Sequence, residues 1–135
     1  MLKDVISTIE SGYRVANANS CAIAGTSMRG GQSPAIGFGD PQLFGSIGAL
    51  GLSMPREPGE RWTSRLADPK ATHTKWKVLC IEFGRQNPGH LSPSRKQHET
   101  LEQAAIKHTY SETEGAHNYA LCQQRTVQLT PLLFR

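Results

Sequence analysis

The densest run of apolar and β-forming side chains along the chain is KWKVLCIEFG, residues 75–84. Side chains alternate across a strand, which places Val78 and Cys80 on one face and Leu79 and Ile81 on the other. Both faces are mostly apolar, as is typical of a strand inside a sheet that is covered on each side. We therefore expect a small sheet centred on residues 76–83.

Helical patterns lie at both ends of the chain. Apolar residues recur at three- and four-residue spacing over residues 2–16, which predicts an amphipathic N-terminal helix. A serine cap followed by proline predicts a helix over residues 92–108, and a weaker pattern predicts a second over 112–125. Residues 126–134 alternate as a short edge strand would.

The segment between residues 25 and 60 has a different composition, with nine glycines and four prolines. These residues favour turns, so we expect a long Gly/Pro-rich loop and consider it a candidate flexible segment. Within it, LFGSIGALGL at residues 43–52 is apolar. Packing against the core is the favoured interpretation, and docking on a partner or on a second copy of the chain is the alternative.

Length and composition indicate one domain. A chain of 135 residues has the size of a typical domain, and Leu, Ile, Val and Phe make up a modest share of it. We predict a single small α+β domain over residues 1–135, with one N-terminal and one or two C-terminal helices on the sheet. No apolar run is long enough to cross a bilayer, and three scattered cysteines suggest no disulfide framework, which fits the cytoplasm.

Positive charge is concentrated in residues 56–96. This basic window has nine Lys or Arg against four acids and contains both tryptophans. Basic side chains neutralise phosphates and tryptophan stacks on unpaired bases. The leading hypothesis is therefore a non-enzymatic module that binds single-stranded nucleic acid or another polyanion, although a solvated basic surface gives the same composition. The candidate binding residues are Arg61, Trp62, Arg65, Lys75, Trp76 and Lys77.

Catalytic patterns are weak, so the balance favours a protein that is not an enzyme. Cys80 or Glu82 with a distant histidine would be the minimal recipe for a thiol or acid/base enzyme. The five histidines lack metal-ligand spacing, no phosphate-binding loop is present, and GxSxG is absent, so we expect no cofactor and no metal site. A recently arisen chain without a refined activity would show the same lack of strong motifs.

Overall fold

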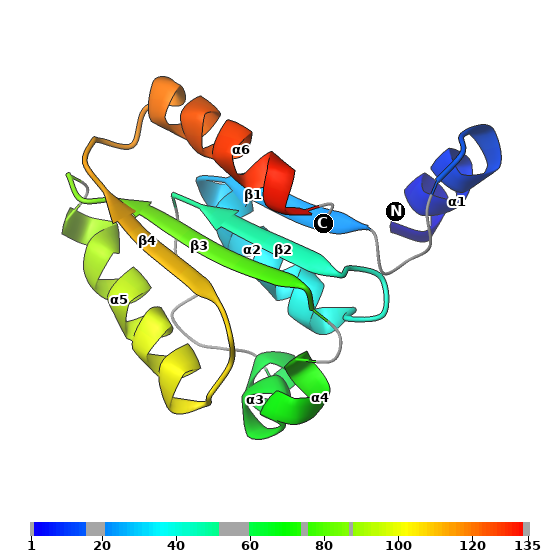
Figure 1. Ribbon diagram of the computed structural model, residues 1–135, viewed down its shortest axis with the longest axis horizontal. Coiled ribbons are helices and arrows are strands. Elements are labelled where there is room, and N and C mark those ends of the chain that lie inside the picture. The colour runs from blue at the N-terminus through cyan, green and yellow to red at the C-terminus, as the bar shows by residue number, and fades with distance from the viewer. Residues whose placement is uncertain (1, 16–20, 52–59, 74–75, 87, 134–135) are drawn as a thin grey trace.

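The computed structural model describes residues 2–15, 21–51, 60–73, 76–86 and 88–133. Helices and strands alternate along the chain (Figure 1). The elements are α1 (Leu2–Gly12), β1 (Ala22–Thr26), α2 (Met28–Gly39), β2 (Ser46–Leu50), α3 (Glu60–Ala67), α4 (Pro69–His73), β3 (Val78–Gly84), α5 (Pro88–Gln103), β4 (Thr109–Thr113) and α6 (Tyr119–Leu133).

The four strands form one parallel sheet in the order β1-β2-β3-β4. Parallel neighbours need a crossover between them, and helices supply each crossover here. β3 lies between β2 and β4. The predicted small sheet around residues 76–83, flanked by helices, is thus confirmed. Helices and strands alternate along the chain and the sheet is parallel, so the fold is α/β, whereas the sequence led us to expect α+β.

Helices cover both faces of the sheet (Figure 1). On one face α2, α3 and α5 bury the larger core cluster, and on the other α6 covers a smaller one. The alternation of β3 explains the division, because Leu79 and Ile81 belong to the larger cluster and Cys80 to the smaller. The larger cluster consists of Phe38, Ile47, Ala49, Trp62, Leu79, Ile81, Leu101 and Ile106.

The Gly/Pro-rich segment 25–60 is not one long loop, because it contains α2 and β2; residues 52–59 lie outside the described part. Its glycines permit close packing. A Cβ on Gly30 would lie 2.6 Å from the Leu50 carbonyl oxygen of β2. Residues 44–50 are buried inside the sheet. The packing interpretation therefore holds for residues 44–50, and Leu52 lies outside the described residues.

Element boundaries differ from the expectation at both ends. α1 is shorter than predicted and stands apart from the sheet (Figure 1). α5 begins at Pro88, which takes the first-turn position expected for Pro93. The segment predicted as a helix over 112–125 begins as β4, and the expected strand at 126–134 is largely α6. Of the helices in the described ranges, none is long and apolar enough to cross a membrane.

Candidate functional site

The turn between β1 and α2 places Ser27 in an unusual backbone conformation. Its φ is 56° and its ψ is −130°, a region that side-chain-bearing residues rarely occupy. Such a conformation costs about 1–3 kcal/mol and is typical of functional sites. The Ser27 N–H donates to the Leu50 carbonyl at 2.8 Å, which ties the turn to the carboxyl end of β2.

Two glycines make this sharp turn possible. A Cβ on Gly25 would lie 2.5 Å from the Arg29 carbonyl oxygen, and one on Gly30 would meet Leu50 backbone. Neither contact is tolerable, so both positions require glycine. Arg29 stands where GxSxG has its second glycine, and Gly30 follows one position later. The strict pattern is therefore absent although the turn is formed.

His117 completes a pair with this serine. Its Nε2 lies 2.8 Å from the Ser27 Oγ, although the residues are 90 positions apart in the sequence. His117 lies in the connection between β4 and α6. Because all four strands are parallel, the connections that follow β1 and β4 both begin at the carboxyl end of the sheet. With the imidazole proton on Nδ1, the hydroxyl donates its hydrogen bond to Nε2.

Gly51 lies against the His117 ring. It has a φ of +78°, and a Cβ at this position would lie 3.0 Å from His117 Nδ1 and 3.1 Å from Cε1. The Gly51 N–H donates to the Glu82 carbonyl at 2.8 Å, which anchors the residue to β3. The carboxyl end of β2 thus contacts both members of the pair, through Leu50 at Ser27 and through Gly51 at His117.

No carboxylate in the described part of the chain hydrogen-bonds His117. The turn after β3 runs beside the segment that leads to His117, because the Gln86 N–H donates to the Gly115 carbonyl at 3.2 Å. The described residues of this turn, Arg85 and Gln86, are not acidic. Glu114 is close in sequence, but it pairs with Arg85 at 3.1 Å. The serine and histidine form a dyad among the residues that can be described.

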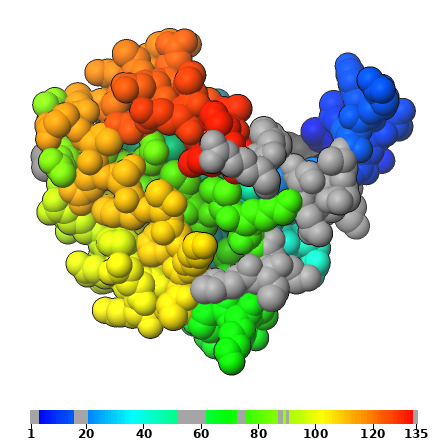
Figure 2. Space-filling model, viewed as in Figure 1, coloured from blue at the N-terminus to red at the C-terminus, as the bar shows by residue number. Residues whose placement is uncertain are grey.

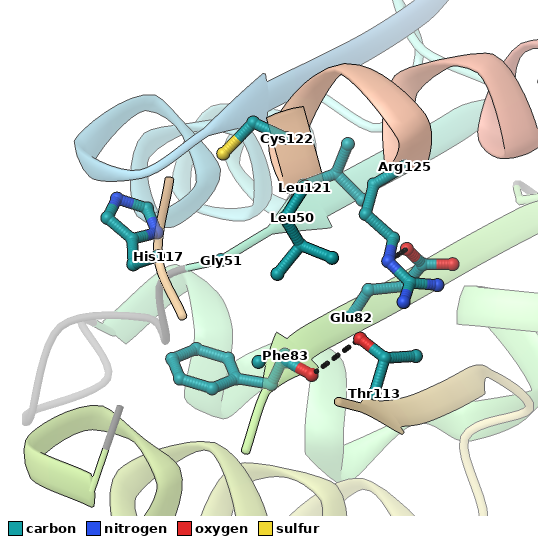
Figure 3. A pocket seen from close by; sticks show the side chains of 10 residues that line it. Leu50, Gly51, Glu82, Phe83, Thr113, His117, Leu121, Cys122 and Arg125 are labelled. Atoms are coloured by element: carbon teal, nitrogen blue, oxygen red, sulfur yellow. Dashed lines mark hydrogen bonds and ion pairs between the residues drawn. The ribbon is translucent and has the colours of Figure 1, made fainter. Parts of the chain in front are cut away.

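A small pocket extends from His117 between α6 and the sheet (Figure 3). Its space of about 20 Å³ holds about one water molecule. Glu82 and Arg125 point toward one another across it, with Arg125 Nε 3.6 Å from Glu82 Oε2. Burial raises the pKa of Glu82, and the Arg125 charge opposes that rise. Leu50, Gly51, Phe83, Gly84, Thr113, Leu121 and Cys122 complete the lining.

Cys80 is unsuited to nucleophilic chemistry. It is buried in the sheet, 1% exposed. Burial and the neighbouring Glu82 raise the pKa of the thiol to about 12. The thiolate, which is the reactive species, is therefore scarce at neutral pH. The structure does not support the thiol enzyme built on Cys80, and it gives Glu82 an ion pair with Arg125 in place of a histidine partner.

The predicted nucleic-acid-binding tryptophans lie in the core. Trp62 is 7% exposed, and its ring centroid is 3.9 Å from that of Phe38. Trp76 is half-buried, and its ring centroid is 4.2 Å from that of Phe38. Both indole rings therefore pack at a tilt against a buried phenylalanine.

Of the four predicted basic residues, the structure describes the side chains of two, Arg65 and Lys77. Arg65 reaches the Phe38 carbonyl at 3.5 Å, while Lys77 is exposed just before β3. Arg61 lies on α3, and Lys75 lies outside the described residues.

Two arginines of the basic window, Arg85 and Arg95, pair with acids that lie outside it. Glu112 on β4 receives two hydrogen bonds from Arg95, at 2.6 and 2.8 Å, and lies 3.6 Å from Arg85. The hydrogen bonds from Arg95 lower the pKa of Glu112 to about 2. The count of charges along residues 56–96 missed this pairing because β4 follows later in the sequence.

Two other histidines contact one another. His98 Nδ1 and His108 Nε2 are 2.8 Å apart, and the His98 ring stacks on Tyr110. No group of three or more metal-ligating side chains occurs among the described residues.

A serine at positive φ between a parallel strand and a helix, paired with a histidine, is the arrangement called a nucleophile elbow in α/β hydrolases. Two solved structures have a similar fold. The S-formylglutathione hydrolase of Staphylococcus aureus matches with a TM-score of 0.70 and 16% identity, over 98% of this chain and 59% of that one. The enterobactin esterase of Shigella flexneri matches with a TM-score of 0.61 and 20% identity, over 98% of this chain and 34% of that one.

The chain thus spans 59% of one structural neighbour and 34% of the other. No protein-family model matches the sequence. At these identities the likeness establishes the fold. The prediction of a non-enzymatic nucleic-acid-binding module is wrong, because the chain has the fold of two hydrolases and both tryptophans pack into the core.

Sequence reasoning missed both members of the dyad. The usable signal was a short apolar run at residues 21–24 followed by Gly25-Thr26-Ser27 and a glycine-rich segment. Arg29 hid that signal, because a strict GxSxG search fails there. His117 carries no local signal, since its partner lies 90 residues away.

Proposed function

We propose that this protein is a serine hydrolase that cleaves esters. The observation that carries the proposal is the 2.8 Å contact between Ser27 Oγ and His117 Nε2 at a strand-to-helix turn with positive φ. A hydroxyl within hydrogen-bond reach of an imidazole is the minimal activated nucleophile. The two structural neighbours are named as a hydrolase and an esterase, which supports the same reaction class.

The chemistry follows from the two side chains. Ser27 Oγ attacks the ester carbonyl carbon while His117 Nε2 takes the hydroxyl proton. The tetrahedral intermediate collapses, and the same proton passes to the departing alkoxide. Water then attacks the acyl-serine, gives a proton to His117, and the acid leaves as Ser27 regains that proton.

The N-terminus of α2 stabilises the charge that develops on the carbonyl oxygen. Met28 is the first residue of α2, and its N–H belongs to the first turn, where helical hydrogen bonds are not made. The N–H of the residue after the nucleophile is one donor of the oxyanion hole in this class. Removing one such donor in other enzymes costs about 10²–10³ in kcat, so this N–H matters.

Covalent labelling tests the proposal directly. A fluorophosphonate ester should modify the wild type at Ser27, as located by peptide mass spectrometry. Ser27→Ala should abolish labelling, and His117→Ala should slow it by about 10²-fold or more, because proton transfer contributes on that scale. Ser7→Ala, on the exposed part of α1, is the matched control and should label at the wild-type rate. An unlabelled wild type with an intact circular dichroism spectrum would refute the proposal.

The leaving group provides a second test. Because no described carboxylate hydrogen-bonds His117, we expect the His117 imidazolium to transfer its proton inefficiently to a poor leaving group. An aryl ester such as p-nitrophenyl acetate loses an anion that needs no proton. We expect its hydrolysis to exceed that of ethyl acetate by a wider margin than in hydroxide-catalysed hydrolysis of the same pair. An equal margin would show that His117 acts as a fully supported acid.

A further inference from the structure

The imidazole of His117 has few side-chain contacts that could hold it in place. Ser27 Oγ lies 2.8 Å from Nε2, and Gly51 lies beside the other ring nitrogen, Nδ1. The residue is exposed, and no carboxylate in the described part of the chain hydrogen-bonds it. In a Ser-His-Asp triad the acid orients the imidazole. Here the direction of the His117 side chain must therefore be set largely by its backbone.

His117 is the central residue of a tight turn. The Asn118 N–H donates to the Ala116 carbonyl at 2.8 Å, which is the hydrogen bond of a γ-turn. The φ of His117 is not positive, so the turn has the inverse form, which is the common one. A γ-turn fixes both backbone angles of its central residue. The Cα–Cβ bond of His117 is therefore aimed by the residues on either side of it.

Asn118 also caps α6. Its side-chain Oδ1 accepts a hydrogen bond from the Leu121 N–H at 2.9 Å, and its carbonyl accepts one from the Cys122 N–H at 3.1 Å. An asparagine oxygen that accepts from an N–H of the first helical turn is an N-cap. α6 begins at Tyr119, the next residue. The turn that contains His117 thus continues directly into a helix.

Leu121 joins this helix start to the end of β3. A Cβ on Gly84 would lie 3.2 Å from Leu121 Cδ2, and one on Gly115 would lie 3.4 Å from the same atom. Gly84 ends β3, and Gly115 belongs to the segment that leads to His117. Further along, α6 lies on the outside of the molecule, orange to red in Figure 2, with Leu129 buried beneath it. The cap therefore ties the histidine turn to a packed helix.

We infer that Asn118 is a positioning residue for His117. Its N–H closes the γ-turn and its side-chain oxygen caps α6, and together these two bonds hold the imidazole against Ser27. Without the cap, the first turn of α6 has an N–H group with no protein partner and frays. The γ-turn then loses its fixed end, and the ring spends less time within reach of the hydroxyl. Only the effect on reactivity rests on the proposed hydrolase function.

Three variants separate this role from general stability. Asn118→Ala removes the capping oxygen, and Asn118→Ser restores one, because serine is an equally good N-cap. Asp68→Ala is the matched control, since Asp68 Oδ1 accepts the Ala71 N–H at 3.0 Å and caps α4 in the same way. Both caps are exposed. Circular dichroism establishes that each variant is folded.

Two measurements are made on each variant. Fluorophosphonate labelling of Ser27 should slow by about 3- to 10-fold in Asn118→Ala, because small misplacements of a catalytic group cost rate on this scale. Asn118→Ser and Asp68→Ala should label at the wild-type rate. The ¹⁵N chemical shift of His117 Nε2, measured at a pH of about 9 where histidine side chains are neutral, reports the hydrogen bond from Ser27 without any reaction. Ser27→Ala should move this signal, and Asn118→Ala should move it in the same direction.

The inference fails if folded Asn118→Ala keeps the wild-type His117 signal, or if Ser27→Ala leaves that signal unchanged. It also fails if Asn118→Ser or Asp68→Ala moves the signal as far as Asn118→Ala, because the cap beside His117 would then have no particular role. A wild type that gives the expected signals in all variants but is not labelled would overturn the hydrolase proposal alone. A wild type that is labelled, with Asn118→Ala equal to it in both measurements, would overturn the positioning role alone.

Discussion

Replacing Gly51 by alanine should separate the positioning of His117 from the stability of the fold. The new Cβ would lie 3.0 Å from His117 Nδ1, whereas ordinary contacts begin near 3.4 Å, so the ring must retreat by a few tenths of an ångström. A misplacement of about 1 Å costs about 10²-fold in rate, so a shift of a few tenths of an ångström should cost about 3- to 10-fold. The positive φ adds a cost of about 1–2 kcal/mol for alanine.

The assay compares two quantities measured on the same protein. The rate of fluorophosphonate labelling reports the dyad, and urea unfolding followed by circular dichroism reports stability. Gly89→Ala is the control, because a Cβ there meets nothing within 4 Å and its φ is not positive. This control should label at the wild-type rate. If Gly51→Ala labels as fast as wild type while folded, the contact between Gly51 and the ring does not position His117.

Three further predictions concern the rest of the fold. Glu112→Gln should lower the unfolding free energy by about 1–2 kcal/mol at pH 7. Because the pKa of Glu112 is lowered to about 2, the difference from wild type in urea titrations should shrink as pH falls below about 5 and disappear below about pH 2. Cys80 should resist iodoacetamide in the folded protein and react once urea unfolds it, because its thiol is buried; rapid alkylation without denaturant would contradict this burial. Leu129→Ala should cost about 2–5 kcal/mol, since this side chain is 2% exposed beneath α6; a cost below 1 kcal/mol would mean that α6 is not firmly packed.

The sequence was most informative where one element carries its own signal. The apolar run at residues 76–83 predicted β3 because burial on both faces leaves an uninterrupted pattern. Spacing alone also predicted the amphipathic α1. β2 was overlooked because Gly45 and Gly48 are typical turn residues. In the structure Gly48 lies directly under Leu129, where a Cβ would be 2.3 Å from its Cδ2. Glycine is needed at this position for close packing against Leu129, and turn propensity does not show such a packing role.

Charge and aromatic content misled because they were counted along the chain. Arg85 and Arg95 converge on Glu112, which lies beyond the basic window, so most of their charge is already paired. Trp62 and Trp76 both pack against Phe38, which precedes the basic window in the sequence. Neighbouring strands of a parallel sheet are joined by long crossover connections, so residues that touch in space are rarely close in sequence.

The dyad depends on the same principle. Ser27 owes its position to Gly25 and Gly30, which allow the turn, and to the Leu50 carbonyl that holds its N–H. His117 follows β4, the outer strand on the other side of the sheet from β1, and its ring lies against Gly51. These contacts come from the segments that follow β1, β2 and β4, and the parallel direction of the strands brings all three segments to the carboxyl end of the sheet. A motif can mark the serine, but the partner that makes the serine reactive is a property of the sheet.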